Sequence, residues 1–326
     1  MRPDPRTSSV RLRIVRGLPP KASFPFRGAC FALGMFDGVH LGHRAILEET
    51  VRTARILGTL PVVLTFDPHP RGILARQAPP FLASFEHRTR LWARAGIEGV
   101  WVIPFDAAFA AMPAEQFVRE VLGRIAGAKA VVLGTRARFG RRNRGGAALL
   151  ARLGKSLGIE VRAVPPVRAG RLEVSSTAVR AALAHGRLRQ AERLLGRPVS
   201  YLAPVVRGMG IGRRLGFPTA NLDARGSLLP PAGIYAGRAR PDGDPRWRPA
   251  GIYLGNRPTF GDAGRPVFEV HLAGVAHPRP LEGRLLEVEF FERLRKDRKF
   301  PSAEALVSQI RRDIAQVLRI AGARRP

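Results

Sequence analysis

The chain contains very little cysteine and no long hydrophobic run. Its single cysteine, Cys30, excludes an intramolecular disulfide and is typical of proteins kept in a reducing compartment. No apolar stretch approaches the roughly 18 residues that a transmembrane helix needs. The first residues also lack the uninterrupted apolar core of a secretory signal. We therefore expect a cytoplasmic protein that neither spans nor binds a membrane.

Lysine is also scarce, and this changes the meaning of the large positive charge. Only five of the 55 basic residues are lysines, so arginine supplies most of the net charge of +30. The arginines are spread along the chain, and clusters such as residues 136–144 are short. Because a dedicated nucleic-acid surface concentrates its charge on one stripe or tail, no specific nucleic-acid partner is expected. The positive field would still attract polyphosphate substrates.

The first half of the chain alternates strand and helix patterns. At 326 residues the chain exceeds the usual size of one hydrophobic core, so two domains are expected. Strands are predicted at residues 29–33, 61–66, 100–105, 130–133 and 160–164. Helices are predicted at 43–57, 84–95, 147–157 and from residue 113. This alternation predicts an α/β domain with a Rossmann-like parallel sheet, whose ligands bind at the carboxyl ends of the strands.

The pattern changes after residue 186. A short helix at 188–195 precedes apolar strands separated by glycine and proline, at 199–206, 234–238, 251–254, 267–272 and 285–291. Their spacing predicts a small antiparallel β-barrel, with residues 236–249 read as a hairpin loop. Ser302 is expected to cap a C-terminal helix whose apolar stripe consists of Val307, Ile310, Ile314 and Val317. The predicted domains are residues 1–187 and 188–326.

A glycine-rich turn lies between the first predicted strand and the first helix. A strand, a glycine-rich turn and a helix N-terminus together form an anion pocket, because backbone N–H groups and the helix dipole point at the ligand. Two histidines add compact side-chain donors, which suit the stabilisation of charge during nucleotidyl transfer. The candidate ATP-binding residues of the turn are Gly34, Phe36, Asp37, Gly38, His40, Gly42 and His43.

A second segment, S-S-T-A-V-R at 175–180, has the character of a phosphate clamp. Its hydroxyl residues, among them Ser176 and Thr177, begin a helix, and Arg180 lies one turn further on. An arginine there can bind a phosphate through two hydrogen bonds. The alternative is an ordinary helix cap followed by a solvent-exposed arginine.

A second glycine-rich cluster begins at residue 208 and indicates kinase chemistry. Its candidate nucleotide-binding residues are Gly208, Gly212, Arg213, Gly216 and Pro218. Thr219 and Asn221 follow at positions i and i+2, so an extended backbone points their oxygen atoms to one side, where they suit Mg²⁺. Glu269, on a later predicted strand, can act as a general base. Simple alternation on an exposed strand face would also explain this glutamate.

These motifs resemble those of the prokaryotic bifunctional riboflavin kinase/FMN adenylyltransferase family. G-M-F-D-G-V-H-L-G-H at 34–43, T-F-D-P-H-P at 65–70 and S-S-T-A-V-R at 175–180 are similar to its adenylyltransferase motifs. The segment 208–222 is similar to its kinase motif, as are 231–235, 255–260 and 268–271.

The resemblance implies two ATP-dependent reactions, in which riboflavin is phosphorylated to FMN and FMN is adenylylated to FAD. It assigns the ATP phosphates in the second reaction to His40, His43 and Arg180, with Ser176 and Thr177. It assigns Glu269 as the base of the kinase reaction, and Thr219 with Asn221 as holders of the Mg²⁺–nucleotide.

The chain departs from the family pattern in the loop 134–140. Arg136 stands where the family has an acidic or amide residue, and Ala137 stands where it has a phenylalanine. A riboflavin kinase with an impaired adenylyltransferase half therefore stays open as an alternative. A nucleic-acid-binding protein on an inactive enzyme scaffold, suggested by the charge of +30, is the alternative from another class. A second departure follows Leu272, where a contact loop of the kinase half differs.

Overall fold

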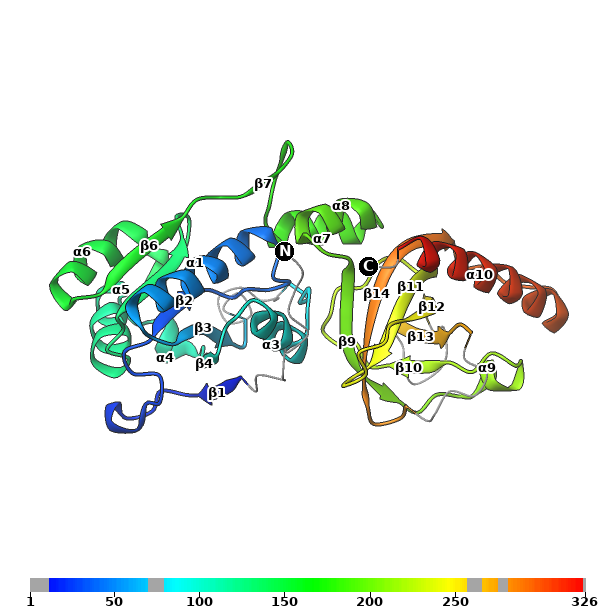
Figure 1. Cartoon of the computed structure of the whole chain (residues 1–326), viewed down its shortest axis with the longest axis horizontal. Coiled ribbons are helices and arrows are strands. Elements are labelled where there is room, and N and C mark those ends of the chain that lie inside the picture. Colours follow the sequence, from blue (N-terminus) through cyan, green and yellow to red (C-terminus); the bar gives the residue numbers. More distant parts are fainter. Residues whose placement is uncertain (1–11, 70–78, 257–265, 275–280, 325–326) are drawn as a thin grey trace. The chain divides into compact units, whose positions relative to one another are not determined.

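The structure, a computed structural model, describes residues 12–69, 79–256, 266–274 and 281–324. It divides into two compact units (Figure 1). The first unit comprises residues 1–79 and 88–174, and the second comprises residues 80–87 and 175–326. The division falls before helix α7 (Ser176–Ala184), which packs on α8 (Leu188–Leu195) within the second unit. The boundary between the two activities, expected after residue 187, stays a prediction.

The first unit contains the predicted parallel sheet. Its six strands are β1 (Arg13–Arg16), β2 (Cys30–Leu33), β3 (Pro61–Asp67), β4 (Gly99–Pro104), β5 (Ala130–Gly134) and β6 (Glu160–Val164). They lie in the order β1-β4-β3-β2-β5-β6, and every pair is parallel. This confirms the α/β expectation. Strand β1 was not predicted, because four residues that begin and end with arginine carry no apolar run.

Helices cover both faces of this sheet. The helical segments are η1 (Lys21–Ser23), α1 (Leu41–Leu57), α3 (Phe85–Arg94), α4 (Ala107–Ala110), α5 (Ala114–Gln116), η2 (Phe117–Ile125), η3 (Arg141–Asn143) and α6 (Ala147–Leu157). The helix predicted from residue 113 starts as α5 and continues as the π-helical η2. A two-stranded hairpin, β7 (Arg168–Ala169) with β8 (Leu172–Glu173), follows β6.

Alternation along β2 divides the core between the two faces. Phe31 and Leu33 pack with side chains of η2 and α6, whereas Cys30 packs with Ala54 of α1 on the other face. Burial raises the pKa of the Cys30 thiol to about 12, so this cysteine is a core residue rather than a nucleophile.

The strand order creates a switch point beside β2. From β2 the chain proceeds through β3 and β4 on one side, and then crosses to β5 and β6 on the other. In open α/β sheets the crevice outside the carboxyl ends of such diverging strands is the usual ligand site. The glycine-rich turn that contains His40 leaves β2 at this point.

The second unit contains the predicted barrel. Its strands are β9 (Val199–Val206), β10 (Ala220–Leu222), β11 (Gly233–Pro241), β12 (Arg248–Asn256), β13 (Pro266–Leu272) and β14 (Leu285–Arg295). They close in the order β10-β13-β12-β11-β14-β9, with antiparallel neighbours. Inward-facing aromatic rings fill the interior, as in the contact of Tyr201 with Phe290 at 5.4 Å between centroids. Strand β10 is too short to have been predicted from periodicity.

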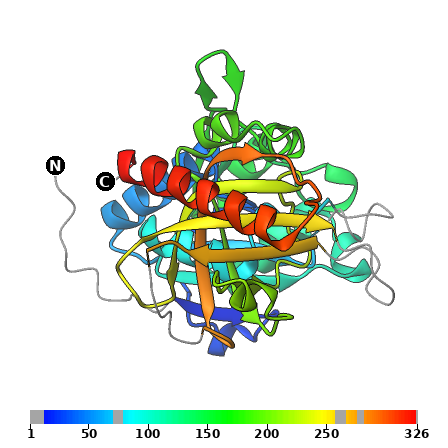
Figure 2. The same cartoon turned by 90° about the vertical axis from the view of Figure 1, so that its right-hand side faces the viewer.

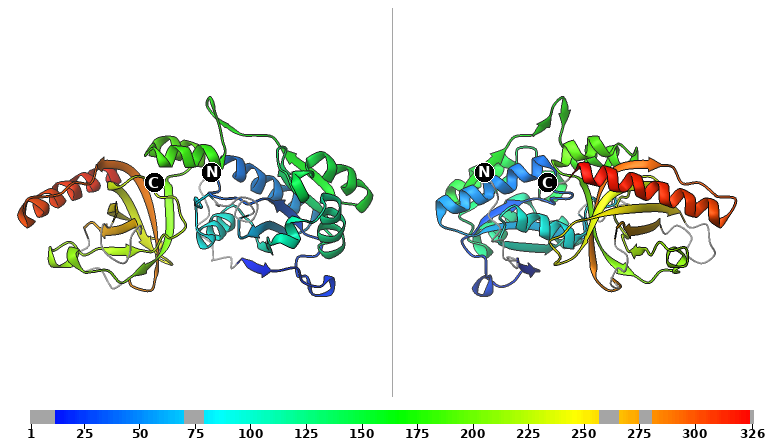
Figure 3. Two further views of the ribbon diagram at one scale, coloured as in Figure 1. Left: turned by 180° about the vertical axis from the view of Figure 1, so that it is seen from behind. Right: turned by 45° about the vertical axis from the view of Figure 1, so that its right-hand side comes forward.

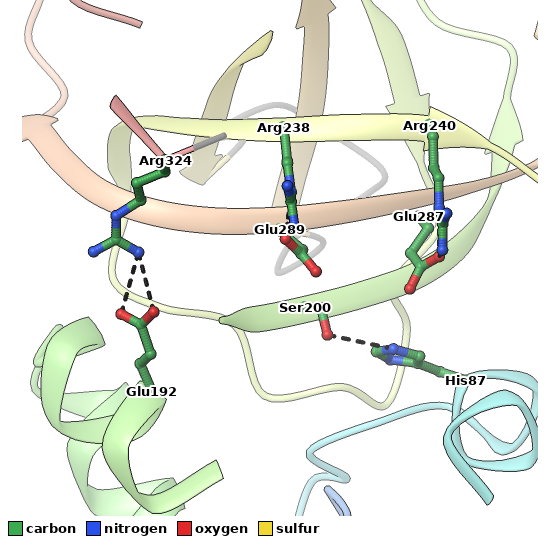
Figure 4. A network of polar contacts seen from close by, with 8 residues as sticks. All are labelled: His87, Glu192, Ser200, Arg238, Arg240, Glu287, Glu289 and Arg324. Atoms are coloured by element: carbon green, nitrogen blue, oxygen red, sulfur yellow. Dashed lines mark hydrogen bonds and ion pairs between the residues drawn. The ribbon is translucent and has the colours of Figure 1, made fainter. Parts of the chain in front are cut away.

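The prediction of a loop across residues 236–249 is wrong. Strand β11 continues to Pro241 and β12 begins at Arg248, so only residues 242–247 form the connection. Two arginines of this stretch pair across the barrel surface. Arg238 lies 2.7 Å from Glu289, and Arg240 lies 2.8 Å from Glu287 on β14 (Figure 4). These paired charges allow the strand to continue.

The C-terminal helix α10 (Ala303–Ala323) lies along the outside of the barrel (Figures 2 and 3). Ser302 caps it as predicted, with its Oγ accepting a hydrogen bond from the Ala305 amide at 3.2 Å. Val317 packs against Ala236 of β11, and Asp313 forms an ion pair with Arg295 at 2.9 Å. None of the helices in the described residues is long and apolar enough to cross a membrane.

Candidate active sites

The turn after β2 is held in an unusual backbone conformation. Phe36 and Val39 have positive φ angles of 49° and 42°, a region that side chains with a Cβ rarely adopt. Both side chains are nearly fully buried, so core packing maintains the conformation. Strain of this kind is concentrated at functional sites. The turn therefore places His40 at the N-cap of helix α1, directly before its first residue.

The two histidines of the turn lie in contact. Their rings stack at 3.6 Å between centroids, with 16° between their planes. His40 caps helix α1, since its Nδ1 accepts a hydrogen bond from the His43 amide at 3.2 Å. In the neutral ring the proton is therefore on Nε2, the nitrogen that can donate to an anion. A Cβ on Gly42 would lie 3.3 Å from the His40 ring, so glycine allows this close packing.

An aromatic pocket of about 390 Å³ lies at the carboxyl ends of the strands, where the histidine turn also leaves β2. Phe66 lies near the end of β3, and Phe105 and Phe139 follow β4 and β5. Phe109 and Phe117 complete the aromatic lining, and Arg138, Arg141, Arg142 and Asn143 also border the pocket. This pocket was not predicted from the sequence, because its rings follow three strands that are far apart in the chain.

The loop 134–140 forms despite its departure from the family pattern. Phe139 is 8% exposed and packs on Phe117, with 5.4 Å between ring centroids. Arg136 forms an ion pair with Glu173 of the β7–β8 hairpin, and both side chains are largely exposed. The unusual arginine is therefore bound at the surface, and it is not among the residues that line the aromatic pocket.

The segment 175–180 begins helix α7 in the second unit. Ser175 is the cap, since its Oγ accepts a hydrogen bond from the Ala178 amide at 3.1 Å. Ser176 and Thr177 form the first turn, and the Nε of Arg180 donates to the Pro80 carbonyl oxygen at 3.1 Å. The histidine turn belongs to the first unit and this segment to the second. Their convergence on one nucleotide stays a prediction.

The three residues predicted for the kinase reaction converge on one side of the barrel. The hydroxyl of Thr219 donates to Oε2 of Glu269 at 3.2 Å. Asn221 on β10 lies directly opposite Glu269 on β13, so their side chains point to the same face. Glu269 is half-buried. A hydroxyl, an amide and a carboxylate therefore share one small surface, although 48 residues separate Asn221 from Glu269 in the chain.

The glycine loop lies against this group. A Cβ on Gly208 would stand 2.1 Å from Nδ2 of Asn221, and one on Gly212 would stand 3.2 Å from Oγ1 of Thr219. The loop contains the one-turn helix α9 (Ile211–Arg214), in which Arg213 is exposed. Pro218 is fixed by the His271 ring, whose Nδ1 lies 2.9 Å from the Pro218 carbonyl oxygen. Any side chain at position 208 would therefore displace the Asn221 amide or the loop backbone.

We expect Gly208→Ala to impair the kinase reaction selectively. The added methyl group must displace Asn221 or the loop, and a misplacement of about 1 Å in an active site can reduce turnover by about 100-fold. Riboflavin phosphorylation by the purified variant measures the effect. Gly322→Ala is the matched control, because a Cβ on Gly322 meets nothing within 4 Å. Equal kinase rates in the two variants would contradict the close approach.

Two family models match the chain. The model of FAD synthetase matches residues 25–178, and that of riboflavin kinase matches residues 195–321. Of the motifs quoted above, Pro70 and residues 257–260 lie outside the described residues.

Similar proteins carry both halves in one chain. A bifunctional riboflavin kinase/FMN adenylyltransferase of Escherichia coli strain K12 is 34% identical over 93% of this chain and 96% of its own length. The protein of the same description from Haemophilus influenzae is 32% identical over 93% and 97%. A crystal structure described as a macrolide-efflux protein from Streptococcus pneumoniae superposes with a TM-score of 0.80 at 27% identity, covering 94% of this chain and 99% of the other. By this similarity the chain belongs to the bifunctional riboflavin kinase/FMN adenylyltransferase family.

Proposed function

We propose that the barrel unit phosphorylates riboflavin at the surface formed by Thr219, Asn221 and Glu269, and that the histidine turn serves the adenylylation of the resulting FMN. Both activities are those of the family, whose two models match this chain. The observation that carries the proposal is the convergence of the three kinase residues from two strands and one loop. Riboflavin, FMN and ATP are the substrates.

In the kinase reaction, Glu269 is the general base. The terminal hydroxyl oxygen of riboflavin attacks the γ-phosphorus of ATP, its proton passes to the Glu269 carboxylate, and ADP leaves. The hydrogen bond from Thr219 fixes one carboxylate oxygen at 3.2 Å. The other oxygen is then the one available to accept the proton. The glycine loop, which approaches Asn221 closely, is suited to covering the nucleotide phosphates.

The donor set of this surface suits Mg²⁺. Hydroxyl, amide and carboxylate oxygens are the ligand types that this ion takes, and it retains waters and phosphate oxygens in its remaining positions. Thr219 and Asn221 would hold the ion together with the nucleotide, because their side chains lie beside the glycine loop. When bound, Mg²⁺ neutralises charge on the transferred phosphoryl group.

In the adenylyl transfer, the histidine turn binds the triphosphate of ATP. His40 presents Nε2 and His43 stacks on it, so the two rings form one donor surface at the N-terminus of α1. A phosphate oxygen of FMN attacks the α-phosphorus, and pyrophosphate leaves. Val174, the last residue of the first unit, has its carbonyl oxygen 3.8 Å from a Cβ placed on Gly42. The assignment of Ser176, Thr177 and Arg180 to the same triphosphate rests on the family resemblance.

The aromatic pocket suits the flavin ring of FMN. Flat aromatic ligands are bound in concave apolar pockets that carry a few polar groups at the edge. The pocket offers Phe66, Phe105 and Phe139 as ring surfaces, and arginines of residues 138–142 for a negatively charged group. It lies at the carboxyl edge of the same sheet as the histidine turn, as a transfer between ATP and FMN requires.

Arg136→Ala is expected to leave FAD synthesis nearly unchanged, within about 2-fold, because exposed ion pairs contribute little and Arg136 pairs with Glu173. Conversion of FMN to FAD at saturating ATP is the measurement. Glu173→Gln is the matched variant and should behave alike. A loss of 10-fold or more in Arg136→Ala alone would instead place this arginine in the nucleotide site.

A product analysis tests the proposed function against both alternatives. The purified protein is incubated with riboflavin, ATP and Mg²⁺, and the flavins are separated by chromatography. Successive appearance of FMN and FAD is expected. FMN without FAD would favour an impaired adenylyltransferase half. No flavin turnover, together with tight salt-sensitive binding of RNA or DNA, would favour the nucleic-acid-binding scaffold. We also infer a cytoplasmic location, supported by the single buried cysteine.

A further inference from the structure

Tyr253 lies beside the proposed kinase residues, one strand beyond Glu269. Asn221, Glu269 and Tyr253 thus form a row across three neighbouring strands. Tyr253 on β12 lies directly opposite Glu269 on β13, just as Asn221 on β10 lies opposite Glu269 from the other side. Adjacent strands are about 4.8 Å apart, so the three side chains border one small area. Their neighbours Ile252, Leu254, Phe268 and Val270 are buried. The row therefore faces the outside of the barrel, where a substrate can reach it.

The ring of Tyr253 lies back along its own strand. A Cβ on Gly255 would stand 2.3 Å from the Tyr253 hydroxyl oxygen and 2.5 Å from the ring carbon that bears it. The ring thus extends over residue 255, where glycine leaves room for it.

The hydroxyl of Tyr253 donates to a carboxylate that follows the last barrel strand. Its oxygen lies 3.0 Å from Oδ2 of Asp297, two residues after the end of β14. Burial, the hydrogen bond to Asp297 and the negative charges of Asp297 and Glu269 together raise the pKa of Tyr253 to about 12. The hydroxyl is therefore protonated at neutral pH and remains a donor. Asp297 itself is exposed, so its carboxylate is accessible.

We propose that Asp297 accepts hydrogen bonds from the inner hydroxyl groups of the polyol chain of riboflavin, and that Tyr253 positions Asp297 for this contact. Carboxylate and phenol groups side by side are suited to a chain of neighbouring hydroxyls, which both donate and accept hydrogen bonds. Binding the inner hydroxyls at Asp297 leaves the terminal hydroxyl to reach Glu269 one strand away. This inference rests on the proposed role of Glu269 in the kinase reaction.

Kinetics of riboflavin phosphorylation by Tyr253→Phe and Asp297→Ala test the inference. Each variant is expected to raise the KM for riboflavin by about 10-fold, which is the lower end of the effect of losing a hydrogen bond to a charged group. The kcat of each variant should stay within about 3-fold of the wild-type value. The double variant should be no worse than Asp297→Ala, because the two residues act as one unit. Conversion of FMN to FAD by the same proteins should be unchanged, which controls for folding. Tyr201→Phe removes a hydroxyl from the barrel interior and should leave the KM for riboflavin unaltered.

A flavin with a 5-hydroxypentyl chain, which lacks the inner hydroxyls, gives a second test. The wild-type protein should prefer riboflavin over this analogue, and Tyr253→Phe and Asp297→Ala should lose most of that preference. Suppose that both variants keep the wild-type KM and the wild-type preference for riboflavin, while Glu269→Gln has no kinase activity. This result would overturn the inference about Tyr253 and Asp297 and leave the proposed role of Glu269 intact. If Glu269→Gln retained kinase activity, the proposed function of this surface would fail instead.

Discussion

Glu269→Gln is expected to abolish the formation of FMN from riboflavin, with a loss of about 10²- to 10⁴-fold, the range for removal of a general base. Glutamine keeps the size of the side chain and can still accept the hydrogen bond from Thr219. It cannot take the proton of the attacking hydroxyl. Conversion of added FMN to FAD should continue at the wild-type rate, because the histidine turn belongs to the other compact unit.

The control for this variant is Glu292→Gln, which neutralises an exposed glutamate on β14. It should leave both reactions unaltered. If Glu269→Gln phosphorylated riboflavin at the wild-type rate, the Glu269 carboxylate would not be the general base of the reaction. Loss of both reactions in Glu269→Gln would show that the two halves are not independent.

His43→Ala is expected to have the reverse effect. Loss of one donor to developing charge lowers turnover by about 10²- to 10³-fold. Loss of the His43 ring also removes the stacking partner of His40. FAD formation from FMN should fall by that factor, while phosphorylation of riboflavin continues. Both rates are measured on the same preparation.

The matched control is His185→Ala, at the exposed C-terminal end of helix α7. This variant should retain both activities. A wild-type rate of FAD formation in His43→Ala would exclude His43 from the phosphate site. His40 would then be the histidine of the turn that donates to the phosphates.

Features encoded by neighbouring residues could be predicted from the sequence. The histidine turn is one continuous segment between a strand and a helix, so its position at the helix N-terminus follows from local pattern alone. The cap at Ser302 was likewise local. Thr219 and Asn221 were identified together because they lie two residues apart, and the barrel then brought Glu269 opposite Asn221.

Features assembled from distant segments could not be predicted. The aromatic pocket takes its rings from the ends of three strands, and the pairing of Arg136 with Glu173 depends on a hairpin 37 residues away. Tyr253 reads as an ordinary strand residue until the barrel register sets it beside Glu269. The continuation of β11 through Arg238 and Arg240 was not predicted, because their partners on β14 are about 50 residues away.

Mixing Glu269→Gln with His43→Ala, each expected to lack one of the two reactions, tests most directly whether the chain has two separate catalytic sites. Glu269→Gln and His43→Ala are each incubated with riboflavin, ATP and Mg²⁺, alone and together, and the flavins are separated. We predict that Glu269→Gln alone forms neither FMN nor FAD, that His43→Ala alone accumulates FMN, and that the mixture forms FAD. A mixture that forms no FAD, or a Glu269→Gln protein that cannot convert added FMN, would contradict the account.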